Sequence, residues 1–321
     1  MPSTIPLSLF VLAIGLLQPA TARADGWPQA VRLTNIISSY PVFTPDGRRV
    51  VFQSNRSGRW EIYSMAIDGT DVRQLTNEPG DNVTPAVSPD GGWIAFAANP
   101  GGESDIFLMR ADGTDRRQLT DHPGDDSHPH WFPDGERLAF NSARTTPDPA
   151  AEWSRQWHEV FSMRPDGSDL RQHTTCRSVC TYPVPSPEGD RLVYRKITDT
   201  PGYQWNLDSA ARNSEVFVAG LDGSGEVNLS NSAAFDGWPT WTPDGDVVFA
   251  SNRAGPANVG QLFRVAADGT NLRQLTGGAW SHVQAAVAPD GAQLLAYRNV
   301  ETDRDEFGDV VLMDLPARNR D

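Results

Sequence analysis

Residues 44–76 form the unit that decides the fold, and they read TPDGRRVVFQSNRSGRWEIYSMAIDGTDVRQLT. The unit holds two turn signals, Pro45-Asp46-Gly47 and Asp68-Gly69, each flanked by alternating apolar and polar residues. Proline presets φ and glycine supplies φ > 0, so both signals are typical of tight β-hairpins. With the strand before Pro45, the unit predicts four antiparallel strands, which we call A, B, C and D.

The unit recurs along the whole chain. The turn prolines are Pro45, Pro89, Pro133, Pro187, Pro243 and Pro289. Each is followed by Asp-Gly or Glu-Gly, and the steps between them are 44, 44, 54, 56 and 46 residues. From each Asp-Gly aspartate to the next turn proline the distance is always 21 residues, so the length variation lies in the B–C loop. A four-stranded repeat of this period is typical of a β-propeller blade.

The number of blades follows from the two ends of the repeat array. The sixth repeat ends with a strand C at Val310 to Leu315 and has no strand D. Near the start of the chain, however, Val31 to Thr34 matches the strand D of the first unit, Arg73 to Thr76. Pairing these two segments closes the ring and removes two open sheet edges. The sequence therefore predicts an all-β fold, a six-bladed β-propeller of four-stranded antiparallel blades, with residues 25–321 as a single domain.

The first 24 residues are expected to lie outside this fold. Leu7 to Leu17 is an apolar run of signal-peptide length, too short to span a bilayer, and Ala22-Arg23-Ala24 is a small-x-small cleavage signal. The segment before the run has no lysine or arginine, which departs from the usual pattern. We expect residues 1–24 to be a cleaved signal peptide and the mature chain to be periplasmic or secreted, with no integral membrane segment.

The repeats resemble the WD40-like repeats of the TolB family, on Pro45-Asp46-Gly47, Ser54-Asn55-Arg56, Glu61-Ile62-Tyr63 and Arg73 to Thr76. The likeness covers about residues 31 to 315. It implies a periplasmic propeller that acts in protein association at the cell envelope. Only a short segment separates the expected cleavage site from the first turn, so the N-terminal domain of TolB is not expected here. The role of that domain is therefore not carried over.

The composition of the chain excludes some classes of binding partner. The net charge is −14 and Lys196 is the single lysine, which argues against a nucleic-acid partner and against a phosphate-binding loop. Many of the acidic residues belong to the repeated turns, so the charge says little about any other ligand. Cys176 and Cys180 stand four apart, and in an oxidising compartment this spacing favours a local disulfide over a metal site.

Two positions before each turn proline are predicted to line a funnel at the mouth of the ring. Residues two apart on a strand point the same way, so both positions would face the axis. The alternative is that some of these residues fill the interfaces between blades. Seven residues before the proline stand Ser38, Asn82, Asp126, Cys180, Asp236 and His282. Five before it stand Tyr40, Thr84, His128, Tyr182, Trp238 and Gln284.

The face that carries the B–C and D–A connections is expected to bind, because both long insertions lie there. Near residues 143–158 and 198–214 these insertions bring the aromatic residues Trp153, Trp157, Tyr203 and Trp205. They are candidates either for contact with a partner or for packing the insertions onto the rim. The opposite face, made of the tight turns, is uniform among the repeats and is interpreted as scaffold.

Two further clusters suggest other chemistry. His128 and His130 lie on one side of a strand, and Asp126 or His282 would complete a metal site or supply a catalytic base. Some propeller polysaccharide lyases use channel histidines in this way. Asp303 to Gly308, with Asp314, resembles an EF-hand loop, but Phe307 occupies a ligand position and the segment leads into a strand.

We therefore expect a non-enzymatic, monomeric module without a cofactor that binds an envelope protein or a peptidoglycan-associated partner. The candidate binding residues are Asp126, His128, His130, Trp157, Tyr182, Trp205, Asp236, Trp238 and His282. A glycan-acting lyase that uses the channel histidines is the alternative.

Overall fold

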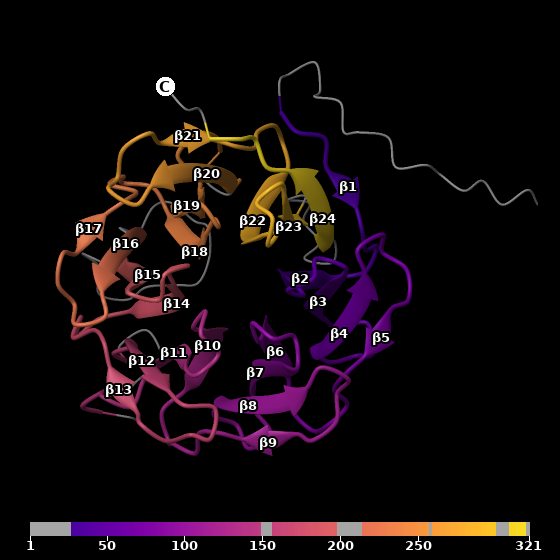
Figure 1. Ribbon diagram of the computed structural model, residues 1–321, viewed down its shortest axis with the longest axis vertical. Helices are drawn as coiled ribbons and strands as arrows, with labels where there is room; N and C mark the ends of the chain where they lie inside the picture. Colours follow the sequence, from indigo (N-terminus) through magenta and orange to yellow (C-terminus); the bar gives the residue numbers. More distant parts are fainter. Residues whose placement is uncertain (1–26, 149–155, 198–213, 257–258, 300–307, 319–321) are drawn as a thin grey trace, which may run out of the picture.

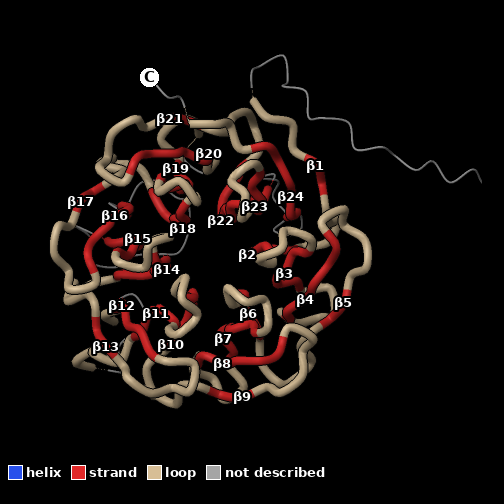
Figure 2. The backbone as a smooth tube through the Cα atoms, viewed as in Figure 1, coloured by secondary structure: helices blue, strands red, loops and turns tan. Residues whose placement is uncertain are grey.

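A computed structural model describes residues 27–148, 156–197, 214–256, 259–299 and 308–318. Every regular element in these ranges is a β-strand, and the strands form six four-stranded antiparallel sheets arranged around a central axis (Figures 1 and 2). The predicted six-bladed propeller is confirmed. Within the described ranges there is no helix that is long and apolar enough to cross a membrane.

Each blade runs from an inner strand at the axis to a short outer strand at the rim, as Figure 1 shows. Blades 1 to 3 comprise β2 (Ser38–Phe43), β3 (Arg49–Ser54), β4 (Glu61–Ala66) and β5 (Arg73–Gln74); β6 (Asn82–Val87), β7 (Trp93–Ala98), β8 (Asp105–Arg110) and β9 (Arg117–Gln118); and β10 (Asp126–Trp131), β11 (Leu138–Ser142), β12 (Glu159–Met163) and β13 (Arg171–Gln172). Blades 4 to 6 comprise β14 (Cys180–Pro185), β15 (Arg191–Ile197), β16 (Ser214–Gly220) and β17 (Val227–Asn228); β18 (Asp236–Trp241), β19 (Asp246–Ser251), β20 (Gln261–Ala266) and β21 (Arg273–Gln274); and β22 (Ser281–Val287), β23 (Gln293–Asn299), β24 (Gly308–Asp314) and β1 (Val31–Arg32).

The ring closes as the sequence predicts. Val31 pairs with Leu312 and Arg32 with Val311, so β1 is the outer strand of the last blade. The Val310 amide also donates to Thr34 Oγ1 at 2.9 Å, a bond that the other blades repeat between strands C and D. The first and last segments of the fold thus share one sheet.

The turn signals act as expected. In the first hairpin the Gly47 amide donates to the Thr44 carbonyl at 2.8 Å, and Gly47 has φ = +67°. In the second, Gly69 donates to Ala66 at 2.9 Å with φ = +82°. Both glycines occupy the left-handed region, where a side chain is strained.

The consensus residues hold strands together inside each blade. In blade 1, Thr76 Oγ1 accepts from the Ile62 amide at 2.9 Å and donates to Glu61 at 2.6 Å. The arginine of the Ser54-Asn55-Arg56 motif has a structural role: the Arg56 guanidinium lies over the rings of Phe52 and Tyr63, 5.2 and 4.7 Å from their centroids. Arg253 stacks in the same way in blade 5.

Candidate functional site

A β-bulge interrupts the inner strand of every blade. In blade 1, Ser39 pairs with Gln53 and Val42 with Val51, so two residues of β2 oppose one residue of β3. The first bulge residue of each blade is left-handed, with φ between +48° and +56°. These residues are Tyr40, Thr84, His128, Tyr182, Trp238 and Gln284. They are the residues five before each turn proline, and none of them is a glycine.

The bulge separates the two rings that the sequence places together. An extra residue in a strand breaks the period-2 alternation, so residues on either side of it no longer share a face. Asp126 and Asp236 are fully buried, and each lies 2.8 Å from an arginine of its own blade, Arg144 and Arg253 respectively. The prediction that they line the funnel is therefore wrong in its geometry.

The remaining members of that first ring are also inside the blades. His282 is 7% exposed on β22, opposite Arg298 of β23. Asn82 donates to Glu61 at 2.9 Å. Because Glu61 belongs to blade 1, this bond ties the inner strand of blade 2 to the neighbouring blade.

The second ring does face the axis, and its aromatic members meet across it. The Tyr40 hydroxyl of blade 1 donates to the Tyr182 hydroxyl of blade 4 at 3.3 Å, and Trp238 Nε1 donates to Tyr40 at 3.3 Å. The His128 and Tyr182 ring centroids are 4.0 Å apart. We call Tyr40, His128, Tyr182 and Trp238 the aromatic layer. Because blades 1 and 4 lie opposite each other, this layer spans the channel.

A cavity of about 210 Å³ adjoins the aromatic layer. Its walls are residues of the inner strands, from the left-handed bulge residue toward the Pro-Asp-Gly turn. Pro41, Val42, His130 and Thr240 are among them. It therefore extends from the layer toward the Pro-Asp-Gly turns, the half of the channel that the sequence assigned to scaffold. Of the predicted binding residues, His128, His130, Tyr182 and Trp238 line this cavity.

The histidines of the cavity are neutral at physiological pH. Burial lowers the pKa of His128 to about 3, and the nearby Arg195 charge adds to the effect. Burial likewise lowers the pKa of His130 to about 4. Both imidazoles are therefore uncharged, and His128 Nδ1 lies 3.0 Å from Asn141 Oδ1.

Arg195 places a buried positive charge behind the aromatic layer. Its side chain is fully buried on β15, and its guanidinium lies 4.9 Å from the centre of the Tyr182 ring. Space for it comes from Gly237, where a Cβ would lie 3.2 Å from Arg195 Cδ. Such a Cβ would lie nearer still to Phe235 Cζ, at 3.1 Å, so the glycine leaves room for both side chains.

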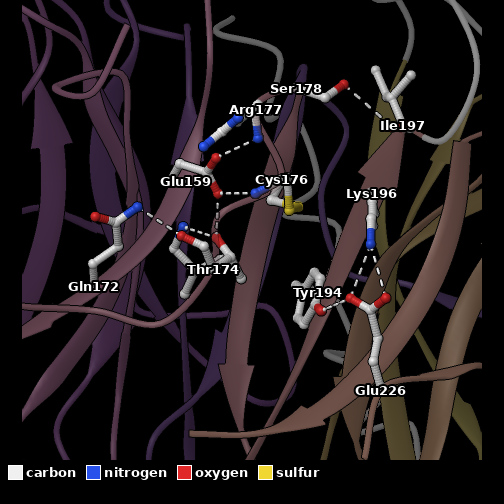
Figure 3. Close-up of a disulfide and its surroundings, with 12 residues drawn as sticks. Glu159, Gln172, Thr174, Cys176, Arg177, Ser178, Tyr194, Lys196, Ile197 and Glu226 are labelled. Carbon is white, nitrogen blue, oxygen red and sulfur yellow. Dashed lines mark hydrogen bonds and ion pairs between the residues drawn. A yellow bond between two sulfur atoms is a disulfide. The ribbon is translucent and has the colours of Figure 1, made fainter. Parts of the chain in front are cut away.

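Cys176 and Cys180 are joined by a disulfide, which Figure 3 shows beside Glu159. The Glu159 carboxylate accepts from the Cys176 amide at 2.8 Å, the Arg177 amide at 2.6 Å and Thr174 Oγ1 at 2.6 Å. Among the described residues, these two cysteines and Glu159 are the single group of three potential metal ligands close enough for one ion. His128, His130 and His282 do not form such a group.

The insertion residues are described in part. Trp157 is partly buried, and its backbone amide and carbonyl both bond to Thr146 Oγ1, at 2.9 and 3.1 Å. Trp153, Tyr203 and Trp205 lie outside the described residues, as do Asp303 to Phe307 of the EF-hand-like stretch and the expected signal peptide.

The sequence carries a signal for the bulge that strict alternation of side chains does not take into account. Five of the six repeats place a proline directly after the left-handed residue: Pro41, Pro85, Pro129, Pro183 and Pro239. Proline in a sheet is confined to edge strands and bulges because it cannot donate to the ladder. Here it marks both an edge strand and a bulge.

The protein is thus a six-bladed β-propeller, closed by its N-terminal strand, with an aromatic layer across its axis. The chain belongs to the family described as the Tricorn protease N-terminal beta propeller domain, whose family model matches residues 67–298.

Solved structures share the fold at low sequence identity. The putative TolB from Agrobacterium tumefaciens is 20% identical, with a TM-score of 0.60 over 88% of this chain and 91% of that chain. TolB from Acinetobacter baumannii is 20% identical, with a TM-score of 0.56 over 73% of this chain and 52% of that chain. An oligogalacturonate lyase in complex with manganese is 14% identical, with a TM-score of 0.58 over 93% and 97%. At these identities the likeness concerns the fold, which is TolB-like as the sequence predicts. No curated protein matches the sequence.

Proposed function

We propose that this chain is a non-enzymatic, TolB-like binding module that holds an envelope protein or a peptidoglycan-linked partner through its central channel. The observation that carries the proposal is the left-handed ring at the axis. Its six positions share one backbone conformation, yet they carry Tyr, Thr, His, Tyr, Trp and Gln. A purely structural position in a repeat would keep one residue type, and Tyr and Trp dominate binding hot spots.

Secretion is part of the same proposal. The segment 1–24 has the features of a cleaved signal peptide, and the Cys176–Cys180 disulfide suits an oxidising compartment. The proposed partner is therefore sought in the periplasm or outside the cell. The loop residues Trp157 and Trp205 remain candidates for additional contacts at the insertion-bearing face.

The test is capture of a partner from an envelope extract by the tagged mature chain. Trp238→Thr, a residue type that the ring uses at Thr84, should reduce recovery of the captured protein about tenfold or more. Leu170→Ala, at an exposed apolar residue outside the channel, is the matched control and should leave recovery unchanged. Equal recovery by the Trp238 variant, or a loss confined to the Leu170 variant, contradicts the proposal.

A glycan-acting enzyme is the second candidate, favoured by the near-full-length likeness to an oligogalacturonate lyase and by two histidines in one cavity. Two features weigh against it. A general base is most effective when its pKa lies near the working pH, whereas those of His128 and His130 are about 3 and about 4. His282 lies inside its blade, and the described residues His128, His130 and His282 do not form a group that could hold one metal ion. Incubation with oligogalacturonides and Mn²⁺, followed by absorbance of the unsaturated product, decides between the binding module and the lyase. Lyase activity that His130→Ala abolishes supports the enzyme.

A further inference from the structure

Two tryptophans occupy the same place in different blades. Trp131 ends β10 of blade 3, and Trp241 ends β18 of blade 5. Each indole donates to a carbonyl of the preceding blade's inner strand: Trp131 Nε1 to Ala86 at 3.1 Å, and Trp241 Nε1 to Val184 at 2.9 Å. The two rings are thus fixed in equivalent positions at equivalent blade interfaces.

The two rings differ in what covers them. The Arg191 guanidinium, from the first residue of β15, lies 5.2 Å from the centre of the Trp241 ring. The equivalent residue beside Trp131 is Trp93, the first residue of β7. Among the described residues no cation–π contact is formed on Trp131. Blade 2 therefore lacks the arginine that the interface of blades 4 and 5 uses.

A cavity of about 470 Å³ lies where that arginine would be. Trp93 does not fill it, because two arginines of its own blade hold its ring: the guanidinium carbons of Arg110 and Arg117 lie 4.0 and 5.1 Å from its centre. The walls include Ser88, Asp90, Trp93, Arg117, Trp131 and Asp134. This cavity lies at the tight-turn face between blades 2 and 3, away from the channel.

The charges of the walls favour a cation. Asp90 and Asp134 come from adjacent Pro-Asp-Gly turns, and the hydrogen bond from the Ser88 hydroxyl holds the pKa of Asp90 below its usual range. Two arginines oppose these carboxylates in part. The Arg110 charge also lowers the pKa of Asp90, and Arg117 Nη2 donates to the Pro165 carbonyl at 3.4 Å. Both guanidinium groups lie over the Trp93 ring, so neither fills the cavity.

We propose that this cavity binds an arginine side chain of a protein partner, with its guanidinium over Trp131 and hydrogen-bonded to Asp90 and Asp134. The bound group would reproduce from outside the contact that Arg191 makes with Trp241. Arginine suits the place because its planar guanidinium stacks on an indole and donates to carboxylates at once. This site is separate from the channel, and the proposal does not depend on the function proposed for the channel.

The test uses N-acetyl-arginine amide as the probe and the indole signals of Trp93 and Trp131 in isotope-labelled protein as the readout. N-acetyl-citrulline amide has nearly the same shape without the charge, and it should bind about 2- to 30-fold more weakly, the range that a cation–π contact contributes. Equal binding of the two probes to the wild-type protein overturns the proposal without any variant.

Two variants test the place. Trp93→Arg introduces, in blade 2, the arginine that blade 4 has at the equivalent residue, Arg191. The new side chain should fill the cavity and lower the probe's affinity at least tenfold. Gln293→Arg adds the same charge at the equivalent residue of blade 6 and should leave the affinity unchanged. Unchanged binding by the Trp93 variant, or an equal loss in both variants, contradicts the assignment of the site.

Discussion

Mild acid should destabilise this propeller through its channel histidines. The pKa of His128 falls to about 3 and that of His130 to about 4 in the folded chain, against 6.5 in the absence of perturbation. The folded state therefore binds fewer protons than the unfolded state between pH 6.5 and about 4, and the free energy of unfolding rises with pH across that window. The contribution is fully present above pH 6.5 and is lost as the pH falls. At pH 5 the unfolded state gains about 2 kcal/mol for each histidine relative to pH 7.5, or about 4 kcal/mol for the pair.

Urea unfolding at pH 7.5 and pH 5 measures this contribution when the wild type is compared with a His128→Gln/His130→Thr variant. Both replacements are residue types that the chain uses at equivalent positions, Gln284 and Thr240. The decrease in unfolding free energy between the two pH values should be smaller in the variant by about 4 kcal/mol. His122→Gln, on a partly exposed loop, serves as the control and should behave as wild type. If the double variant loses as much stability as the wild type, the channel histidines are not held neutral by burial.

Two further predictions concern the scaffold. Gly113→Ala should lower the urea midpoint far more than Gly47→Ala, although both glycines are left-handed. A Cβ at Gly113 would lie 2.7 Å from the Leu75 carbonyl oxygen, whereas a Cβ at Gly47 would have no other atom within 4 Å. We expect about 1 to 2 kcal/mol for the strain shared by both, with the clash in addition at Gly113, so equal midpoints would refute the close approach. Arg253→Met should destabilise by about 3 kcal/mol because it leaves the Asp236 carboxylate buried without its partner. Adding Asp236→Asn should recover part of that loss in the same urea assay, and no recovery would show that the ion pair is not the cause.

The architecture is readable from the sequence because the signals that set it are local and repeated. A Pro-Asp-Gly turn needs its glycine at positive φ wherever it occurs, and Gly47 shows the requirement directly. Closure by β1 follows from the strand-D consensus at Val31 to Thr34, a pattern that only the missing outer strand of the last blade accommodates. Six correlated copies leave little freedom in where strands begin and end.

The sequence predicts the channel less well, because the prediction rests on strict alternation of side chains along the inner strand. That assumption holds only for a regular strand, and the bulge after Ser39 and its five counterparts reverses which side chains face the axis. Tyr182 and Trp238 therefore lie where they were expected, whereas Asp126 and Asp236 lie inside the blades. Contacts across the axis, such as that between Tyr40 and Tyr182, join residues far apart in the chain, and no local pattern encodes them.

The central claim is that the partner is held at the axis of the ring. A photo-crosslinking amino acid in place of Gln284, which lines the axial cavity, tests this proposal in cells that produce the protein. We expect one discrete crosslinked protein from this position, and none from the same group in place of Val72, an exposed residue away from the cavity. A product from Val72 but not from Gln284 would contradict it.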